Sequence, residues 1–441
     1  MGDVIGKGPV RDLAVDFYRV SGVVLVVLGH WLAAAVTYHD GHFGRENPLA
    51  DLPWTQYLTW VFQAVPTFFL AAGYAGALSW EHRRNREGFA HHTWLRHRLA
   101  RVLGPCGVYL ALVSAVVVAL EVSGVTGSAL QYAGWALAMH LWFLAIYLVV
   151  VTMTPIAVAA HQRWGLRAPA VLALGAVAID VAAVGCRVPY IGWLNYVLCW
   201  GTLYQLGIAW RGGLLGGRKP LLMTAVSAIA LAVLVRVGPY PVSMIRVAGH
   251  TVHNTTPPTV ALLAFACAQT GLAMTLAPAV RRALRSARAQ RVVSVANDNV
   301  MALYLWHLVP LVIVAVVGYP AGLFPQPAEG SAAWWLFRLV WLIILSMVTA
   351  VQMTLLWWGR RVFAAPLPTV DLPWADRWAE PVLLVGAAMA TYGLAYLAAE
   401  GFAPHGHFAW ISVLAFAGGA VLIGFRPTRV GSPVHSTPRA G

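Results

Sequence analysis

An apolar stretch near the start of the chain, RVSGVVLVVLGHWLAAAV (residues 19–36), contains two side chains able to do chemistry, Arg19 and His30. An α-helix turns about 100° per residue, so eleven steps leave the two roughly 20° apart around the axis and about 16 Å apart along it. Both therefore face the same way and can line one channel. Ionisable groups inside a membrane span are costly and indicate a functional face. A histidine in that position can serve as a general base or as a nucleophile.

Asp16 stands three positions before Arg19, a spacing at which a carboxylate can hold a guanidinium on one helical face. Alone, the pair also fits an interfacial ion pair in which Arg19 reaches back to the inner headgroups. His30 lies too far along the helix for that explanation. Asp16, Arg19 and His30 are therefore the candidate catalytic group.

The chain that must position these residues has the composition of an integral membrane protein. It has 441 residues, 59% of them hydrophobic and 10% charged, whereas a soluble domain usually has about 25% charged residues. The net charge of +14 does not indicate a nucleic-acid partner, because the basic residues lie in short loops between apolar runs. The four cysteines lack zinc-site spacing, so we expect neither metal nor disulfides.

Apolar runs long enough to cross a bilayer recur along the chain, and we expect an all-α, polytopic bundle of about twelve transmembrane helices. With both ends inside, 24 of the 30 lysines and arginines fall in inner segments, which supports an N-in, C-in topology. We expect one transmembrane domain over residues 1–425 and a disordered cytoplasmic tail over 426–441. The expected spans are 19–38, 57–79, 102–120, 136–158, 168–185, 192–210, 220–238, 258–279, 300–318, 333–356, 380–399 and 409–425.

The pattern Asp-x-x-Arg, ten residues, then His on the first span resembles the membrane-bound acyltransferase-3 family. Four further segments resemble that family in the same order, and together they cover residues 11–318. The expected spans after residue 318 lie beyond the matched region. Ala72 stands where a serine is common, which argues against a hydroxyl role there. The four segments are PTFFLAAGY (66–74), WLRHRLARVLGP (94–105), HLWFLAIYL (140–148) and ALYLWH (302–307).

The resemblance implies transfer of an acyl group, most simply acetyl, from cytoplasmic acyl-CoA to a hydroxyl of a glycan, lipid or other acceptor. The enzyme would lie among the lipids of the plasma membrane, with acyl-CoA as co-substrate, no tightly bound cofactor and no nucleic acid. Arg98 and Arg101 match the family's basic inner motif, and guanidinium groups suit the phosphate oxygens of CoA. Both arginines also fit the plain positive charge of an inner loop.

Two mechanisms fit His30. As a general base it would take the proton of the acceptor hydroxyl, and as a nucleophile it would form an acyl-imidazole. We prefer the base, because an alcohol acceptor needs activation in either case. His140 and His307 either bind acceptor, polarise the thioester carbonyl, or are satisfied structurally by neighbouring helices. The other candidate substrate-binding residues are Trp142 and Tyr304.

Two other classes of protein fit part of the pattern. Twelve spans with both ends inside is a common layout of secondary transporters without acyl-transfer activity. Against this class, the sequence shows no matching halves and no embedded acidic relay beyond Asp180. Single histidines on separate spans also permit a bis-histidine membrane haem, but no other feature supports it.

Overall fold

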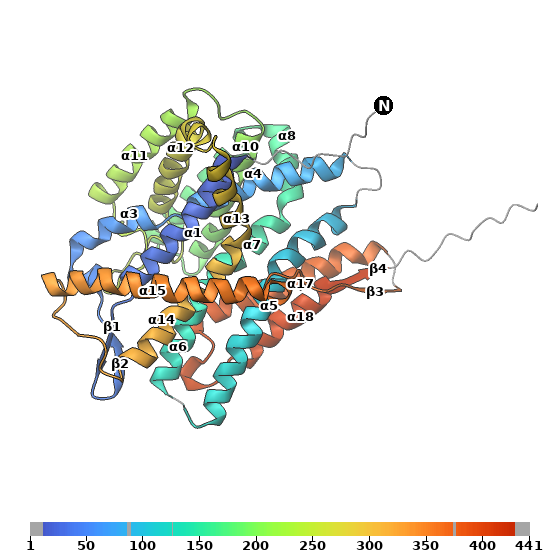
Figure 1. Ribbon diagram of the computed structural model, residues 1–441. Helices are drawn as coiled ribbons and strands as arrows, with labels where there is room; N and C mark the ends of the chain where they lie inside the picture. Colours follow the sequence, from blue (N-terminus) through green and yellow to red (C-terminus); the bar gives the residue numbers. More distant parts are fainter. Residues whose placement is uncertain (1–11, 86–89, 126, 374–375, 428–441) are drawn as a thin grey trace, which may run out of the picture.

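The computed structural model of the protein describes residues 12–85, 90–125, 127–373 and 376–427, and it is mostly helical (Figure 1). The expected all-α, polytopic membrane class is confirmed. The longer helices are α1 (Leu13–Ala33), α4 (Val65–Arg84), α5 (His91–Val122), α6 (Ser128–Ala138), α7 (Leu141–Thr152), α8 (Thr154–Trp164), α9 (Arg167–Asp180), α10 (Asn195–Arg211), α11 (Lys219–Val237), α12 (Val260–Ala283), α13 (Ala287–Trp306), α14 (Leu308–Gly318), α15 (Ala332–Trp358), α17 (Ala379–Glu400) and α18 (Trp410–Gly424).

Short elements connect these helices. The strands are β1 (Val36–His39), β2 (His42–Arg45), β3 (Val370–Leu372) and β4 (Phe425–Pro427). The single helical turns are α2 (Pro48–Asp51), α3 (Thr59–Phe62), α16 (Arg360–Phe363), η1 (Pro53–Leu58), η2 (Val181–Gly185), η3 (Ile191–Leu194), η4 (Asp376–Trp378) and η5 (Pro404–Gly406).

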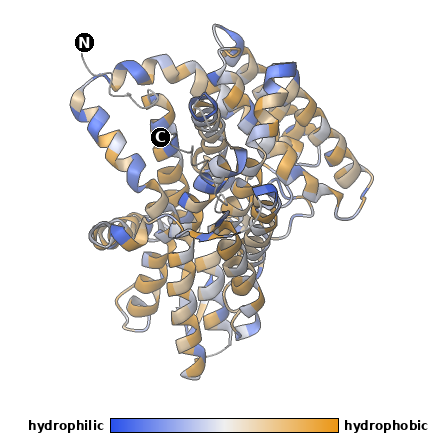
Figure 2. Cartoon of the chain, turned by 90° about the vertical axis from the view of Figure 1, so that its right-hand side faces the viewer, coloured by the Kyte–Doolittle hydropathy of each residue, from blue (hydrophilic) through white to orange (hydrophobic). Residues whose placement is uncertain are grey.

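Among the described residues, nine helices are long and apolar enough to cross a membrane, and the bent pair α13–α14 makes ten if it forms one span. The remaining two expected spans fall on shorter helices, since α10 has 17 residues and α18 has 15. Twelve spans and the N-in, C-in topology therefore stay predictions. Hydrophobic residues cover the outer helices (Figure 2), and on α11 Leu222 and Ile229 are 64% and 65% exposed. Apolar faces of this kind suit contact with lipid acyl chains.

The first helix begins and ends earlier than the expected 19–38 span. The Asp12 carboxylate caps α1 by accepting a hydrogen bond from the backbone N–H of Ala14 (3.0 Å), so the helix starts at Leu13. After Ala33 the chain enters the β1–β2 hairpin, whose Asp40–Gly41 turn has positive φ at both residues. His30 therefore lies in the last turn of α1 and not in the middle of the first span.

The last two helices pack against the rest of the bundle. Helix α17 packs on α18 and α7, and α18 packs on α5. Between them, Phe402 is fully buried beside Tyr109 of α5. The parallel pair β3–β4 ties the end of α18 to the segment before α17, and Arg426 binds Asp371 there at 2.9 Å. Arg426 and Pro427, the first two residues of the expected tail over 426–441, belong to β4, and the rest of that tail lies outside the described residues.

Helices α4 and α10 approach each other closely through two glycines. Gly73 of α4 lies against the backbone of Tyr204, and Gly207 of α10 lies against the backbone of Leu70. A Cβ at either glycine would overlap a carbonyl oxygen of the other helix. Small residues let membrane helices gain van der Waals contact where the hydrophobic effect is weak. Because α4 also packs on α1, this contact fixes the surroundings of the first helix.

We expect Gly73→Ala and Gly207→Ala each to lower the thermal unfolding temperature in detergent, because overpacking costs about 1–3 kcal/mol. Gly201→Ala on the same helix α10 is the matched control, since its new Cβ would meet its nearest neighbour, Leu172, at 3.7 Å. Wild-type unfolding temperatures for both test variants would contradict the close approach of the two helices.

Candidate functional site

Three histidines from distant parts of the chain meet in the interior of the bundle. His30 belongs to α1, His140 lies between α6 and α7, and His307 lies between α13 and α14. Nδ1 of His30 is 2.8 Å from Nε2 of His307, and the two rings meet edge to edge, with nearly parallel planes and centroids 5.1 Å apart. The ring of His140 stands edge-on to that of His307, also at 5.1 Å. Each histidine was a candidate from the sequence, but their contact was not foreseen.

The interruption at His307 has a local cause in Pro310. Proline has no N–H, so the carbonyl of Trp306 loses the hydrogen bond that a continuous helix would supply. Helix α14 then leaves α13 at an angle of 46°. Side chains satisfy two of the carbonyls near the break. The Trp31 indole N–H donates to the carbonyl of His307 (2.9 Å), and Nδ1 of His307 is 2.8 Å from the carbonyl oxygen of Tyr304.

A second interruption separates α6 from α7 at Met139 and His140. The hydroxyl of Tyr304 donates a 2.6 Å hydrogen bond to the carbonyl of His140, and the two rings are in edge contact at 5.2 Å. Non-helical backbone at membrane depth is tolerated only where the protein satisfies it or where it lines a cavity. Tyr304 therefore supports one interruption with its side chain and the other with its carbonyl.

His30 is the accessible member of the histidine cluster. His307 is fully buried and His140 is 2% exposed, whereas His30 as a residue is only partly buried. Nδ1 of His30 contacts His307, and its Nε2 has no hydrogen-bond partner among the described residues. Both ring nitrogens of His140 are buried and equally without a partner in the described part of the chain. One nitrogen of His30 is thus available to a substrate.

The cluster does not have the geometry of a metal site. A metal ion bound by two imidazoles lies about 2 Å from each nitrogen, which separates the two nitrogens by more than the 2.8 Å seen between His30 and His307. Elsewhere in the described residues, no group of three or more histidine, cysteine or acidic side chains is suited to hold a metal ion.

Arg19 faces the same neighbouring helix as His30, as their spacing predicts. Nη1 of Arg19 is 3.4 Å from Oδ1 of Asn297 on α13, ten residues before His307. The two contacts show that α1 and α13 lie side by side and run in the same direction. Asp16 is buried one turn before Arg19. Asn297 was missed, because an asparagine within the polar run AQRVVSVANDN carries no distinct sequence signal.

The start of α1 is held by an ion pair with α12. Two guanidinium nitrogens of Arg281 bind the Asp12 carboxylate at 2.6 and 3.1 Å, and the Tyr74 hydroxyl donates to the same carboxylate at 3.3 Å. Burial acts to raise the pKa of Asp12, but the hydrogen bonds and charge of Arg281 outweigh it, and the pKa lies below its ordinary value. The carboxylate therefore stays ionised as a helix cap.

The two arginines expected to bind phosphate differ in exposure. The guanidinium of Arg98 is partly buried, lies over the Trp94 ring (5.5 Å), and faces Gly76 of α4 together with the hydroxyl of Tyr204. Arg101, one turn later on α5, is exposed. Of these two arginines, Arg98 is therefore the one that points into the bundle.

The same basic segment of the sequence also contains Arg96, which the structure distinguishes from these two. Its side chain is 4% exposed, and its Nε and Nη2 atoms are buried without a hydrogen-bond partner among the described residues. A buried guanidinium with unused donors is energetically costly. The sequence alone did not set Arg96 apart from the other arginines of this segment, because its burial depends on the tertiary packing of α5.

Trp142 lies beside the histidine cluster and not within it. Its neighbour Phe143 contacts the ring of Tyr304 at 5.3 Å. The structure thus brings His140, Tyr304 and His307 together with His30, and it places Trp142 in an adjoining aromatic layer. The rings nearest to Trp142 are those of Trp200, Tyr196 and Phe143, at 5.8, 6.3 and 6.3 Å.

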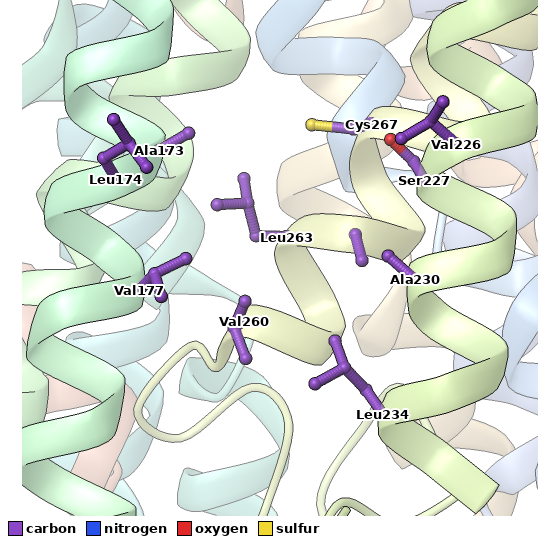
Figure 3. A pocket seen from close by; sticks show the side chains of 11 residues that line it. Ala173, Leu174, Val177, Val226, Ser227, Ala230, Leu234, Val260, Leu263 and Cys267 are labelled. Carbon is purple, nitrogen blue, oxygen red and sulfur yellow. The ribbon is translucent and has the colours of Figure 1, made fainter.

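Two apolar cavities lie between helices. The first has a volume of about 190 Å³, lies between α9, α11 and α12, and is lined by residues such as Leu174 and Leu263 (Figure 3). It contains none of the candidate site residues. The second, of about 300 Å³, lies between α1, α13 and α15 and is lined in part by Trp31 and Leu303. It therefore borders the segments that carry His30 and His307.

Comparison with known proteins identifies the chain at the level of a family. Residues 12–357 match the family described as an acyltransferase domain. No curated protein and no solved structure matched the chain. The matched region begins at the cap of α1 and ends in the last turn of α15, so it contains all three histidines of the cluster. Because the match covers most of the chain, this multi-pass membrane protein belongs to the acyltransferase-3 family.

Proposed function

We propose that the protein transfers an acyl group, acetyl by preference, from cytoplasmic acyl-CoA to a hydroxyl of a glycan or lipid acceptor. The proposal depends above all on the position of His30. In a chain of the acyltransferase-3 family, His30 lies at the accessible edge of a buried histidine cluster and keeps one ring nitrogen unoccupied. An imidazole held in this way suits removal of a proton from an alcohol near neutral pH.

In the proposed reaction His30 is the general base. Nε2 takes the proton of the acceptor hydroxyl while the oxygen attacks the carbonyl carbon of the thioester. A C–O bond forms as the C–S bond breaks, and the proton on Nε2 then passes to the departing thiolate. The products are the ester and free CoA. In the alternative, the same nitrogen attacks the thioester first and carries the acyl group as an acyl-imidazole.

The donor phosphates bind at the inner end of α5 in this proposal. Arg98 is the stronger candidate because it points into the bundle, whereas Arg101 is exposed. Arg19 lies about 16 Å before His30 on the same face of α1, along the direction that an extended pantetheine arm would follow. Asp16, buried one turn earlier, orients Arg19.

The acceptor and the acyl group meet at the histidine cluster. His140, His307 and Tyr304 shape its buried side, and Trp142 extends the aromatic wall. The apolar cavity beside Trp31 suits the hydrocarbon part of a lipid acceptor. We propose a location in the plasma membrane, with acyl-CoA as co-substrate, no tightly bound cofactor and no nucleic-acid partner.

A secondary transporter is the alternative function. Interrupted spans such as those at His140 and His307 also occur in transporters, where they bind substrate near the middle of the membrane. Membership of an acyltransferase family favours acyl transfer.

The first test is His30→Ala in purified protein supplied with labelled acetyl-CoA. Loss of a positioned general base lowers rates by about 10²- to 10⁴-fold, so acyl transfer should fall by that factor while acetyl-CoA still binds. His30→Gln should fail equally, because an amide cannot take up a proton. The measurement is release of CoA together with transfer of the label.

The control for this test is His42→Ala, which changes an exposed histidine of the β1–β2 hairpin and should keep full activity. Each variant is first checked for wild-type expression and thermal stability. Near-normal acyl transfer by a well-folded His30→Ala protein would show that His30 is not the general base.

A second test measures the affinity for acetyl-CoA by calorimetry. Charge-assisted hydrogen bonds contribute about 1.5–3 kcal/mol each, so Arg98→Ala should raise the dissociation constant about 10- to 100-fold. Arg101→Ala should have a smaller effect, because exposed charges are screened by water and salt. Arg163→Ala, an exposed arginine on α8, is the control and should bind normally. If both the Arg98 and the Arg101 variant bound acetyl-CoA with unchanged affinity, these arginines would not bind the donor. Their positive charge would then serve only to set the orientation of α5 in the membrane.

A further inference from the structure

We infer that His307 is a positioning residue that holds His30 in the one tautomer whose Nε2 carries no proton. The inference rests on the proposed role of His30 and names the residue that prepares it for that role. It comes from two hydrogen bonds in series, which join the carbonyl of Tyr304 to His307 and His307 to His30.

The first bond determines where His307 carries its proton. The Tyr304 carbonyl oxygen has no hydrogen and can only accept, and it lies 2.8 Å from Nδ1 of His307. An unprotonated Nδ1 would set two lone pairs against each other at that distance, so Nδ1 is the protonated nitrogen. A second proton on His307 would place a cation at a fully buried position, which is costly without a counter-charge. Nε2 of His307 is therefore an acceptor.

The second bond transfers this constraint to His30. Nδ1 of His30 lies 2.8 Å from the acceptor nitrogen of His307 and must therefore carry a proton. A neutral imidazole has one N–H and one unprotonated nitrogen. The proton of His30 is thus on Nδ1, and Nε2 presents a lone pair. Nε2 is also the nitrogen that has no partner among the described residues.

The fold holds this series of bonds in place from both ends. The carbonyl of Tyr304 is one of the last four of α13, which lack intrahelical donors, so it is free to accept from His307. On the other side, Trp31, which follows His30 on α1, donates to the backbone carbonyl of His307. Two consecutive residues of α1 thus bind the same residue at the break. Complete burial of His307 prevents water from taking its place.

The arrangement has a direct consequence for the proton-transfer step. When Nε2 of His30 takes the proton of the acceptor hydroxyl, the ring becomes an imidazolium with a proton on each nitrogen. Its Nδ1–H still donates to the lone pair of His307, so the same bond stabilises the new positive charge. No atom of His307 changes its bonding in this step. His307 orients the base and does not itself transfer the proton.

The experiment combines nitrogen NMR with kinetics on the full-length protein in detergent. Protein labelled with ¹⁵N-histidine is compared with His30→Gln, whose missing signals identify the two ring nitrogens of His30. In the wild type, Nδ1 of His30 should be protonated and Nε2 unprotonated. In His307→Leu, which removes the acceptor, both tautomers should appear, and kcat should fall at least about tenfold with an unchanged KM for acetyl-CoA.

His307→Gln is the matched variant, because its amide oxygen can accept the same hydrogen bond from His30. It should keep the His30 proton on Nδ1 and retain more of kcat than His307→Leu. A wild-type His30 with its proton on Nε2 would overturn the inference, as would a His307→Leu protein with unchanged tautomer and kcat. If the wild type transfers no acyl group, the proposed function fails, while the nitrogen spectra still decide the tautomer.

Discussion

The site depends on how the protein satisfies its backbone where two helices break inside an apolar bundle. Lipid offers no hydrogen bonds, so each free carbonyl at His140 and around His307 must find a donor within the protein. Tyr304 and Trp31 supply two of these donors, and the ring of His307 supplies the third. Meeting this constraint is what places three imidazoles in contact. The candidate chemistry therefore follows from a structural requirement of the breaks.

The sequence predicts the class of fold and the shared face of Arg19 and His30 well, because both predictions depend only on how residues differ from their neighbours in the sequence. Arg19 and His30 stand out against an apolar run, and their spacing correctly predicts a shared face on α1. The same reliance on apolar residues places the start and end of α1 wrongly. A search for apolar residues begins the span after Asp16, but the Asp12 cap and the contact of Arg19 with Asn297 allow the helix to include these polar residues.

The rest of the site could not be predicted because it depends on contacts between distant segments. His30 and His307 are 277 positions apart, and nothing in either segment alone indicates their pairing. The interruption at His307 was missed as well, although Pro310 is a visible signal for it. On α5, Arg96, Arg98 and Arg101 are alike in the sequence, and only packing separates a buried, an inward-facing and an exposed arginine.

The double role of Tyr304 also has a mechanical consequence. Its hydroxyl is bonded to one broken span, and its carbonyl is bonded to the histidine at the other. A shift of α13 along its axis would move Tyr304 and His307 together. It would therefore strain at once the bond from Tyr304 to His140 and the bond from His307 to His30, and packed interiors respond to such strain by switching between discrete arrangements. The two breaks then behave as one unit, in which the contacts of His140 and those of His30 are made together or lost together.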